Sequence, residues 1–245
     1  MARLEKVRAV VLSSLPLGEA DRIVRLFTRE LGRVDAVVKG VRKTTSRWGG
    51  RLEPFNVCDL MLHPGRSLYT VTQAQLVDVF AHLRDDRQAL VAAALVCETA
   101  AGLTPEQEPE ARVFALLRNT LRELDRGLQG PATDSPLVLG AVLKLLFEAG
   151  YLPILDHCAA CGSGGRALGF SASRGGLVCG DCLGDSVPIT PEAVAALRAA
   201  IELPLAELRE EPASAAVGEA LRAAHLLYSY HTGSRLRSLR FARPA

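Results

Sequence analysis

The chain has 245 residues, of which 49% are hydrophobic and 23% charged, as in an ordinary globular protein. Its apolar runs are too short for a membrane helix and its start lacks a signal-peptide pattern, so we expect a cytoplasmic protein that binds no membrane and keeps its thiols reduced. The net charge of +2 is uneven: residues 1–80 and 222–245 each carry +5, and residues 81–221 carry −8. Basic segments at both ends are typical of nucleic-acid binding or of ordinary solvated charge.

The first 80 residues contain short β-branched runs of the kind that predicts strands. Turn signals separate five such runs, at 7–14, 21–30, 32–40, 54–63 and 67–73. Because five short strands follow one another closely, they predict a small closed or nearly closed barrel such as an OB-fold, with an SH3-like barrel as the competing hypothesis. We therefore expect residues 1–80 to form one β domain.

From about residue 74 onward the hydrophobic period becomes helical. Helices are predicted at 108–127, 134–150, 190–204 and 213–232. Between the ends of the second helix only Lys144 and Glu148 are charged, which predicts a central, buried position. The sequence thus predicts an α+β protein, in which an N-terminal OB-fold barrel precedes an α-helical domain at 81–245 that carries a cysteine insert.

Four of the six cysteines form two Cys-x-x-Cys pairs, Cys158 with Cys161 and Cys179 with Cys182. This spacing is typical of a zinc site, and the residues between the pairs predict a short hairpin, so we expect a zinc ribbon at 157–183. Four thiolates would fill one tetrahedral, structural Zn²⁺ site and leave no position for water or substrate. Oxidisable free thiols are the alternative, because a thioredoxin-like pair would need a βαβ setting.

The cysteine insert is not expected to contact nucleic acid, because its few arginines are outnumbered by acids. Cys58 and Cys97, which lie in an apolar strand and an apolar helix, are predicted to be buried core thiols.

The segment KGVRKTTSRWGGR, residues 39–51, is called the basic loop here. It contains Lys39, Arg42, Lys43, Arg47 and Arg51 with no acid, beside hydroxyl groups, a glycine pair and Trp48. Lysine and arginine neutralise phosphates, and the tryptophan is a candidate for stacking on a base. The basic loop would leave the barrel near the face that OB-folds use for oligonucleotides. The alternative is a solvated loop with Trp48 packed on the barrel.

Signatures of catalysis are missing: the sequence has no phosphate-binding P-loop, no nucleophile elbow and no zinc-protease motif. We therefore do not expect an enzyme. The competing hypothesis from another class is a zinc-ribbon interaction module of the transcription or translation machinery, in which the barrel docks protein. Salt-dependent binding of unrelated single strands would separate it from a nucleic-acid binder.

Two parts of the chain resemble the bacterial recombination and repair family RecO. The first is LGRVDAVVKGVRKTTSRWGGRLEPFNVCDLMLHPGRSLYTVTQAQL, and the second is LKLLFEAGYLPILDHCAACG followed by GGLVCGDC. The resemblance implies a recombination mediator of the RecF pathway that binds single- and double-stranded DNA and anneals complementary strands. It also implies a nucleoid-associated role, in which RecR and the protein together help load recombinase onto DNA coated with single-strand-binding protein (SSB).

Carried over position by position, the resemblance implies DNA contacts by the five cations of the basic loop and, more weakly, by Arg33 on the preceding strand. Near the C-terminus, Arg235, Arg237 and Arg240 occur without an acid. We hypothesise that they form a second cationic surface, which holds a second strand during annealing or receives an acidic protein segment such as the end of SSB. The alternative is a frayed basic end.

Overall fold

A computed structural model describes residues 4–42, 46, 48 and 50–241, and it divides into two compact units. The first unit contains the chain up to Ala81 together with Thr104–Arg122, and the second contains His82–Leu103 and the chain from Glu123 onward. Residues 104–122 thus group with the barrel by their contacts, although they lie beyond the boundary at residue 80 that the sequence predicts.

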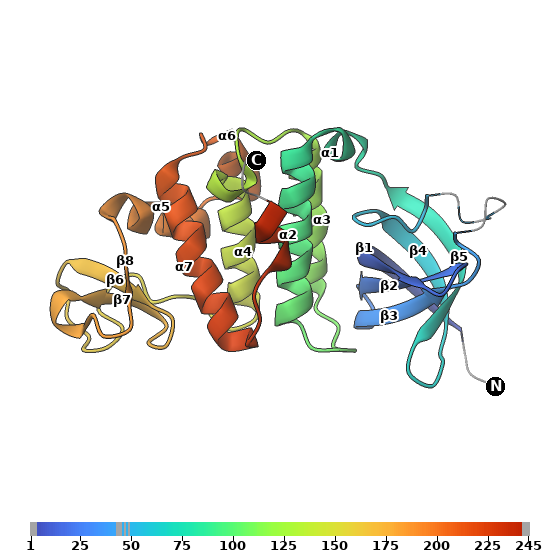
Figure 1. The fold of residues 1–245 in the computed structure, drawn as a ribbon, viewed down its shortest axis with the longest axis horizontal. Coiled ribbons are helices and arrows are strands. Elements are labelled where there is room, and N and C mark those ends of the chain that lie inside the picture. Colours follow the sequence, from blue (N-terminus) through green and yellow to red (C-terminus); the bar gives the residue numbers. More distant parts are fainter. Residues whose placement is uncertain (1–3, 43–45, 47, 49, 242–245) are drawn as a thin grey trace. The chain divides into compact units, whose positions relative to one another are not determined.

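The first unit is built on a closed five-stranded barrel (Figure 1). Its strands are β1 (Glu5–Leu17), β2 (Asp21–Thr28), β3 (Gly32–Val38), β4 (Val57–His63) and β5 (Tyr69–Asp78). They follow the order β1-β2-β3-β5-β4, and β3 pairs with β5 in parallel while the other pairs are antiparallel. This barrel confirms the OB-like fold class that the sequence predicts.

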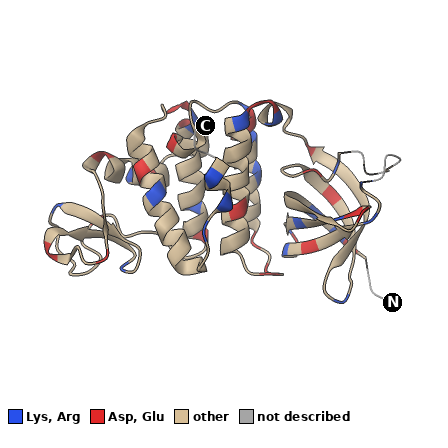
Figure 2. Cartoon of the chain, viewed as in Figure 1, with Lys and Arg blue, Asp and Glu red and all other residues tan. Residues whose placement is uncertain are grey.

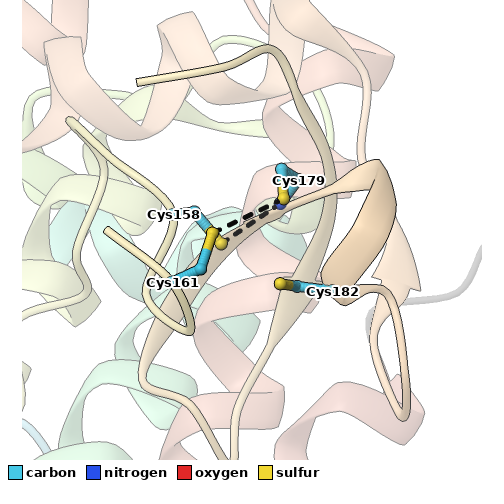
Figure 3. A group of neighbouring side chains, drawn as sticks. All are labelled: Cys158, Cys161, Cys179 and Cys182. Atoms are coloured by element: carbon cyan, nitrogen blue, oxygen red, sulfur yellow. Dashed lines mark hydrogen bonds between the residues drawn. The ribbon is translucent and has the colours of Figure 1, made fainter. Parts of the chain in front are cut away.

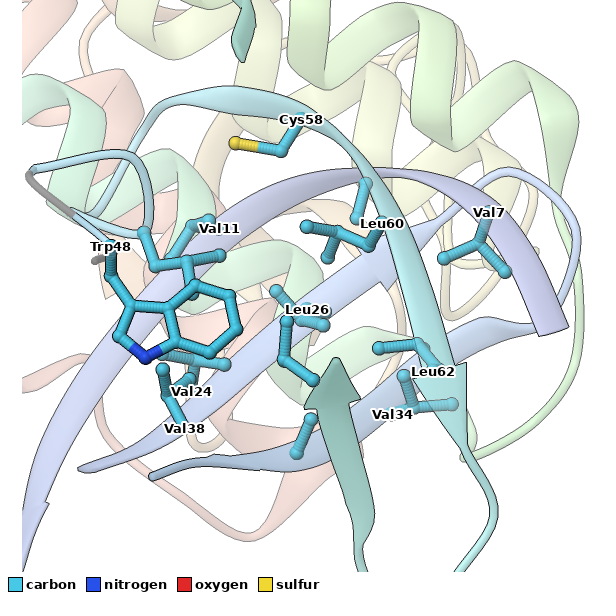
Figure 4. Close-up of a cluster of buried hydrophobic side chains, with 14 residues drawn as sticks. Val7, Val11, Val24, Leu26, Val34, Val38, Trp48, Cys58, Leu60 and Leu62 are labelled. Carbon is cyan, nitrogen blue, oxygen red and sulfur yellow. The ribbon is translucent and has the colours of Figure 1, made fainter. Parts of the chain in front are cut away.

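The pairing of β1 with β4 and of β3 with β5 closes the barrel, and its strands alternate between buried and partly exposed side chains, most regularly in β3. The inward-facing residues form one core (Figure 4), made of Val7, Ala9, Val11, Val24, Leu26, Val34, Ala36, Val38, Trp48, Leu52, Cys58, Leu60, Leu62 and Val71. Strand β5 continues to Asp78, which pairs with Val57, so the helical structure begins at Ala81 and the prediction of a change near residue 74 was wrong. Mixed burial along β5 hides the period of two in the sequence.

Residues 104–122 belong to the barrel unit because they contact β3 and β5. The Arg33 side chain donates to the Thr104 carbonyl at 3.0 Å and pairs with Glu106 at 3.2 Å. A Cβ added at Gly32, where φ is +69°, would lie 2.0 Å from the carbonyl oxygen of Glu108, so only glycine permits this close approach. Helix α3 (Ala111–Asp125) follows, beginning in this unit.

The second unit consists of helices and a small sheet (Figure 1). Its helices are α1 (Ala81–Asp85), α2 (Arg87–Leu103), α4 (Pro136–Glu148), α5 (Pro191–Glu202), α6 (Leu205–Glu210) and α7 (Ala215–Thr232), with short 3₁₀ turns η1 (Ala132–Asp134) and η3 (Arg237–Phe241). Helix α4 contacts α2, α5, α6 and α7 and is buried from Pro136 to Leu143, as its sequence predicts. Among the described residues, no helix combines the length and apolarity needed to cross a membrane.

The small sheet, called the ribbon here together with the two cysteine pairs, has the strand order β7-β6-β8. Strand β6 (Ala167–Ser171) pairs with β7 (Gly176–Cys179) as a hairpin, and β8 (Val187–Pro188) completes the sheet. The 3₁₀ turn η2 (Gly180–Cys182) follows β7 directly. The ribbon thus carries the hairpin that the cysteine spacing predicts.

Candidate functional site

The four cysteines of the two pairs converge on one point of the ribbon (Figure 3). Cys158 and Cys161 lie in the turn before the hairpin, Cys179 ends β7, and Cys182 ends η2. All four sulfur atoms lie within 4.8 Å of one another, and the sulfurs of Cys161 and Cys179 are 3.8 Å apart. Zinc–sulfur bonds of about 2.3 Å in a tetrahedron place the sulfurs roughly 3.8 Å apart, so the cluster has the dimensions of a metal site.

The backbone around the cluster favours ionised sulfur. The Cys179 N–H donates to the Cys158 sulfur at 3.4 Å, and this bond, with others from the Cys161 and Ala160 amides, lowers the pKa of Cys158 to about 6. The pKa of Cys182 is raised, because hydrogen bonds to the neighbouring cysteines favour its protonated form. A divalent cation would reverse that effect, since its charge stabilises every thiolate around it. The cluster can therefore hold a metal ion with four sulfur ligands.

The remaining cysteines are unreactive core residues, as predicted. Cys58 is 0% and Cys97 1% exposed, and burial raises the pKa of each thiol to about 12. The Cys58 thiol also donates to the Arg51 carbonyl at 3.1 Å, at the end of the basic loop.

In the basic loop, the exposed cations lie beside the β1–β2 turn. Lys39 and Arg42 are exposed, and Arg51 is half-buried. The Arg42 N–H donates to the Ala20 carbonyl and its guanidinium to the Gly18 carbonyl, both at 2.9 Å, so the loop is tied to that turn. Lys43 and Arg47 lie outside the described residues.

Trp48 is part of the barrel core and does not present its ring to a ligand (Figure 4). Its side chain is 4% exposed, and its indole N–H donates to the Lys39 carbonyl at 2.8 Å. The stacking hypothesis is therefore wrong for this structure, and the alternative, a tryptophan packed on the barrel, is what is observed. A buried indole stabilises the folded state more than an exposed one does, provided that its N–H has a hydrogen-bond acceptor.

Asn56 is a loop-holding residue that the sequence analysis missed. It is 3% exposed, and its amide donates to the carbonyls of Gly50 at 3.0 Å and Arg51 at 3.2 Å. The preceding Phe55 has a φ of 75°, which is uncommon for a bulky residue. In the sequence, the one sign of this role is that Asn56 is a polar residue at a position of the predicted strand 54–63 that alternation places toward the core. Together, Trp48 and Asn56 hold both ends of the loop against the barrel.

Arg33, predicted as a weaker DNA contact, is engaged within the protein instead. Its side chain is 15% exposed and bonds to Thr104 and Glu106. That prediction is therefore not supported, because the position of an arginine on a strand does not reveal which segment covers it.

The C-terminal arginines Arg235, Arg237 and Arg240 are all exposed, whereas Leu236 and Ser238 between them are buried. The 3₁₀ turn η3 contacts α2, so residues 234–241, called the C-terminal segment here, are packed on the helical unit. The alternative of a frayed end does not describe these residues.

Comparison with known proteins matches the N-terminal and the C-terminal part of the chain to the two domains of one family. Residues 1–80 match the family model described as "Recombination protein O N terminal", and residues 84–240 match "Recombination protein O C terminal". Among similar proteins, each named DNA repair protein RecO, that of Frankia casuarinae is 49% identical over 176 residues, covering 71% of both chains. That of Rubrobacter xylanophilus is 40% identical over 213 residues and covers 83% of both. That of Nocardioides sp. is 44% identical over 204 residues, covering 80% of this chain and 82% of the relative.

Proposed function

Because this chain belongs to the RecO family of DNA repair proteins, we propose that it is a recombination mediator that binds DNA through the basic loop of its barrel. It binds single- and double-stranded DNA, anneals complementary strands, and with RecR helps load recombinase onto SSB-coated DNA. In this role it works in the cytoplasm, at the nucleoid, and catalyses no covalent chemistry.

The observation that carries the proposal is the attachment of Arg42 to the β1–β2 turn. OB-folds bind oligonucleotides across the face of strands 2 and 3 and the loops that flank it, including the loop between strands 1 and 2. The attachment brings the basic loop to one of those loops. Trp48 and Asn56 bond to backbone carbonyls at the two ends of the loop, so the backbone at those ends loses little conformational freedom when the cations meet phosphates.

The loop cations should supply affinity without sequence preference, since phosphate contacts carry no base information. Among the described residues, Lys39 makes no side-chain hydrogen bond or ion pair, so its ammonium group is available to a phosphate. Each neutralised phosphate of a single strand contributes about 0.7 to the slope of log affinity against log salt.

The test is the triple variant Arg42→Ala/Lys43→Ala/Arg47→Ala, measured for binding of unrelated single strands at several salt concentrations. We expect equal weakening on every sequence and a slope reduced by about 2 units. The matched control Lys6→Ala/Arg29→Ala/Arg112→Ala removes the same charge from other exposed positions of the barrel unit and should leave the slope nearly unchanged. A folded loop variant with the wild-type slope would show that the barrel docks something other than DNA.

We also propose that the metal held by the four cysteines is a single structural Zn²⁺. Four thiolates are a typical ligand set of structural zinc, and a complete tetrahedral shell leaves no position for substrate. The ion would hold the two cysteine pairs together rather than contact DNA, since the ribbon between them exposes only Arg166 and Arg174 as cations.

A further inference from the structure

Glu98 of α2 binds the C-terminal segment through three hydrogen bonds. One carboxylate oxygen accepts the Arg237 N–H at 2.8 Å, and the other accepts the Ser238 N–H at 2.9 Å and the Ser238 hydroxyl at 2.8 Å. Backbone N–H groups at the start of a helical turn have no partner within it, so this carboxylate satisfies donors that would otherwise need water. Bonds to an ionised acceptor are the stronger class of hydrogen bond.

The chain reaches Glu98 by reversing after α7 (Figure 1). Gly233 ends that helix with a left-handed φ of 64°, and the Tyr228 hydroxyl lies 3.4 Å from the Ser234 hydroxyl. Leu236 and Ser238 are then buried at 5% and 6% exposure. Because the buried residues alternate with arginines, Arg235 and Arg237 are directed away from the surface on which the segment packs.

Arg235, Arg237 and Arg240 are exposed, and Figure 2 colours the basic residues blue along the chain. Among the described residues, the guanidiniums of Arg235, Arg237 and Arg240 form no ion pair, although the Glu98 carboxylate accepts the backbone N–H of Arg237. The carboxylate is occupied by backbone and hydroxyl donors instead. The Arg240 guanidinium lies 4.7 Å from the centre of the Phe241 ring, which is 55% exposed. Guanidinium groups and an exposed ring are the groups that hold a single strand by its phosphates and bases.

We infer that Glu98 is a positioning residue for a second nucleic-acid site, formed by Arg235, Arg237 and Arg240 and used by the second strand during annealing. The inference rests on the proposed function, because annealing requires one site to hold each strand against mutual repulsion. By fixing the segment on α2, the carboxylate removes the entropy that a loose basic end would lose on binding. The negatively charged Glu98 therefore favours binding of a negatively charged strand, which is the opposite of what its charge alone would predict.

The test compares Glu98→Ala with Glu202→Ala, which removes the same charge from an exposed position at the end of α5. In the full-length protein we expect Glu98→Ala to speed trypsin cleavage after the three arginines about 10-fold or more, since it removes the bonds that hold the segment, and Glu202→Ala to leave cleavage unchanged. This readout involves no DNA, so it tests the positioning role separately.

Annealing of complementary oligonucleotides is the second readout. Glu98→Ala should slow annealing several-fold although it makes the protein more positive, and Arg235→Ala/Arg237→Ala/Arg240→Ala should slow it at least as much. Both variants should still bind one short oligonucleotide per chain through the basic loop, and both should lose the second one that the wild type binds at the arginines. If wild-type protein does not bind that oligonucleotide, the proposed function fails, whereas the protease result still stands.

Two outcomes would overturn the inference. Wild-type annealing by Glu98→Ala with a freely cleaved segment would show that positioning is irrelevant. Wild-type annealing by the triple arginine variant, together with lost binding of a labelled hexa-aspartate peptide, would show that the segment receives an acidic protein rather than a strand.

Discussion

The barrel and the ribbon are both small β structures, but they are held together by different forces. In the part of the barrel that the structure describes, fourteen buried residues form one core, and nearly all of them are aliphatic. Among the described residues, the buried cluster around the cysteines consists of Cys158, Val178 and Cys179, with Ala160 and Cys182 packed against it. The strands of the ribbon bury Phe170 and Leu177 as well, but a structure this small usually needs a metal ion or another cross-link to offset the entropy of ordering its chain.

This contrast explains why the two structures differ in their surfaces. The barrel is stabilised from inside, so its loops are free to carry cations such as Lys39 and Arg42. The four cysteines of the ribbon lie together, and they can supply all four ligands of a tetrahedral metal site. The residues that can bind a metal and the residues proposed to bind DNA therefore belong to different parts of the chain.

Loss of the metal should have the largest effect, and it should be confined to the ribbon. We expect one zinc per chain and, after chelation or in Cys158→Ser/Cys179→Ser, loss of amide protection in β6 and β7 with the barrel unaffected. Structural zinc contributes about 10–16 kcal/mol to the folding of zinc-finger peptides at neutral pH. Metal analysis and hydrogen exchange would measure this, with Cys58→Ala/Cys97→Ala as the thiol control. A zinc content well below one per chain, or amide protection of β6 and β7 without metal, would show that the ribbon does not depend on a metal and so differs less from the barrel.

Truncation of the barrel core should rank second. Trp48→Ala removes a buried indole, and we expect it to lower the free energy of unfolding of the barrel by about 3–5 kcal/mol. Trp48→Phe keeps most of the apolar contact and loses the bond to the Lys39 carbonyl, at a cost of about 1 kcal/mol. Denaturant titration would measure both. Equal effects of the two variants would show that the hydrogen bond, rather than burial, holds the basic loop.

A smaller effect on stability is expected where strand β7 of the ribbon packs on the backbone of Ile154, which precedes the ribbon in the chain. A Cβ added at Gly176 would lie 2.3 Å from the Ile154 carbonyl oxygen, which accepts the Leu177 N–H at 2.9 Å. Gly176→Ala should therefore cost about 1–3 kcal/mol, measured as stability of the zinc-bound protein. Gly164→Ala, where a Cβ would meet no atom within 4 Å, is the control. No difference between the two variants would show that metal ligation alone determines the ribbon.

Surface charge on the barrel should matter least. Arg8 donates to Asp59 at 2.7 Å and lowers the pKa of that carboxyl, but both side chains are about one-third exposed, so the pair contributes less than about 1 kcal/mol. Because the folded-state pKa is lowered, the contribution is present above the unfolded pKa of about 3.9 and is lost as pH falls through the folded value. Asp59→Asn should flatten the dependence of unfolding free energy on pH below about pH 4. A large loss of unfolding free energy in Asp59→Asn at neutral pH would contradict the view that the apolar core supplies most of the stability of the barrel.

Local patterns in the sequence were sufficient for most of the elements and for the metal cluster. The strand alternation of residues 32–38 and the prolines at the starts of α4 and α5 act on neighbouring residues, so both are readable without a tertiary structure. Two residues between the cysteines of each pair likewise place both sulfurs on one side of a turn. The chemistry of the basic loop was readable for the same reason, because residue types determine which ligands they suit.

Exposure and distant contacts were decided only by the tertiary structure. Trp48 could have stacked on a base or packed on the barrel, and the barrel interior settled the choice. Arg33 reads as a surface cation until residues 104–106 cover it, and the C-terminal segment reads as a loose end until Glu98, 139 residues earlier, binds it. Side-chain chemistry follows from the sequence one residue at a time, whereas burial depends on which remote segment arrives to cover it.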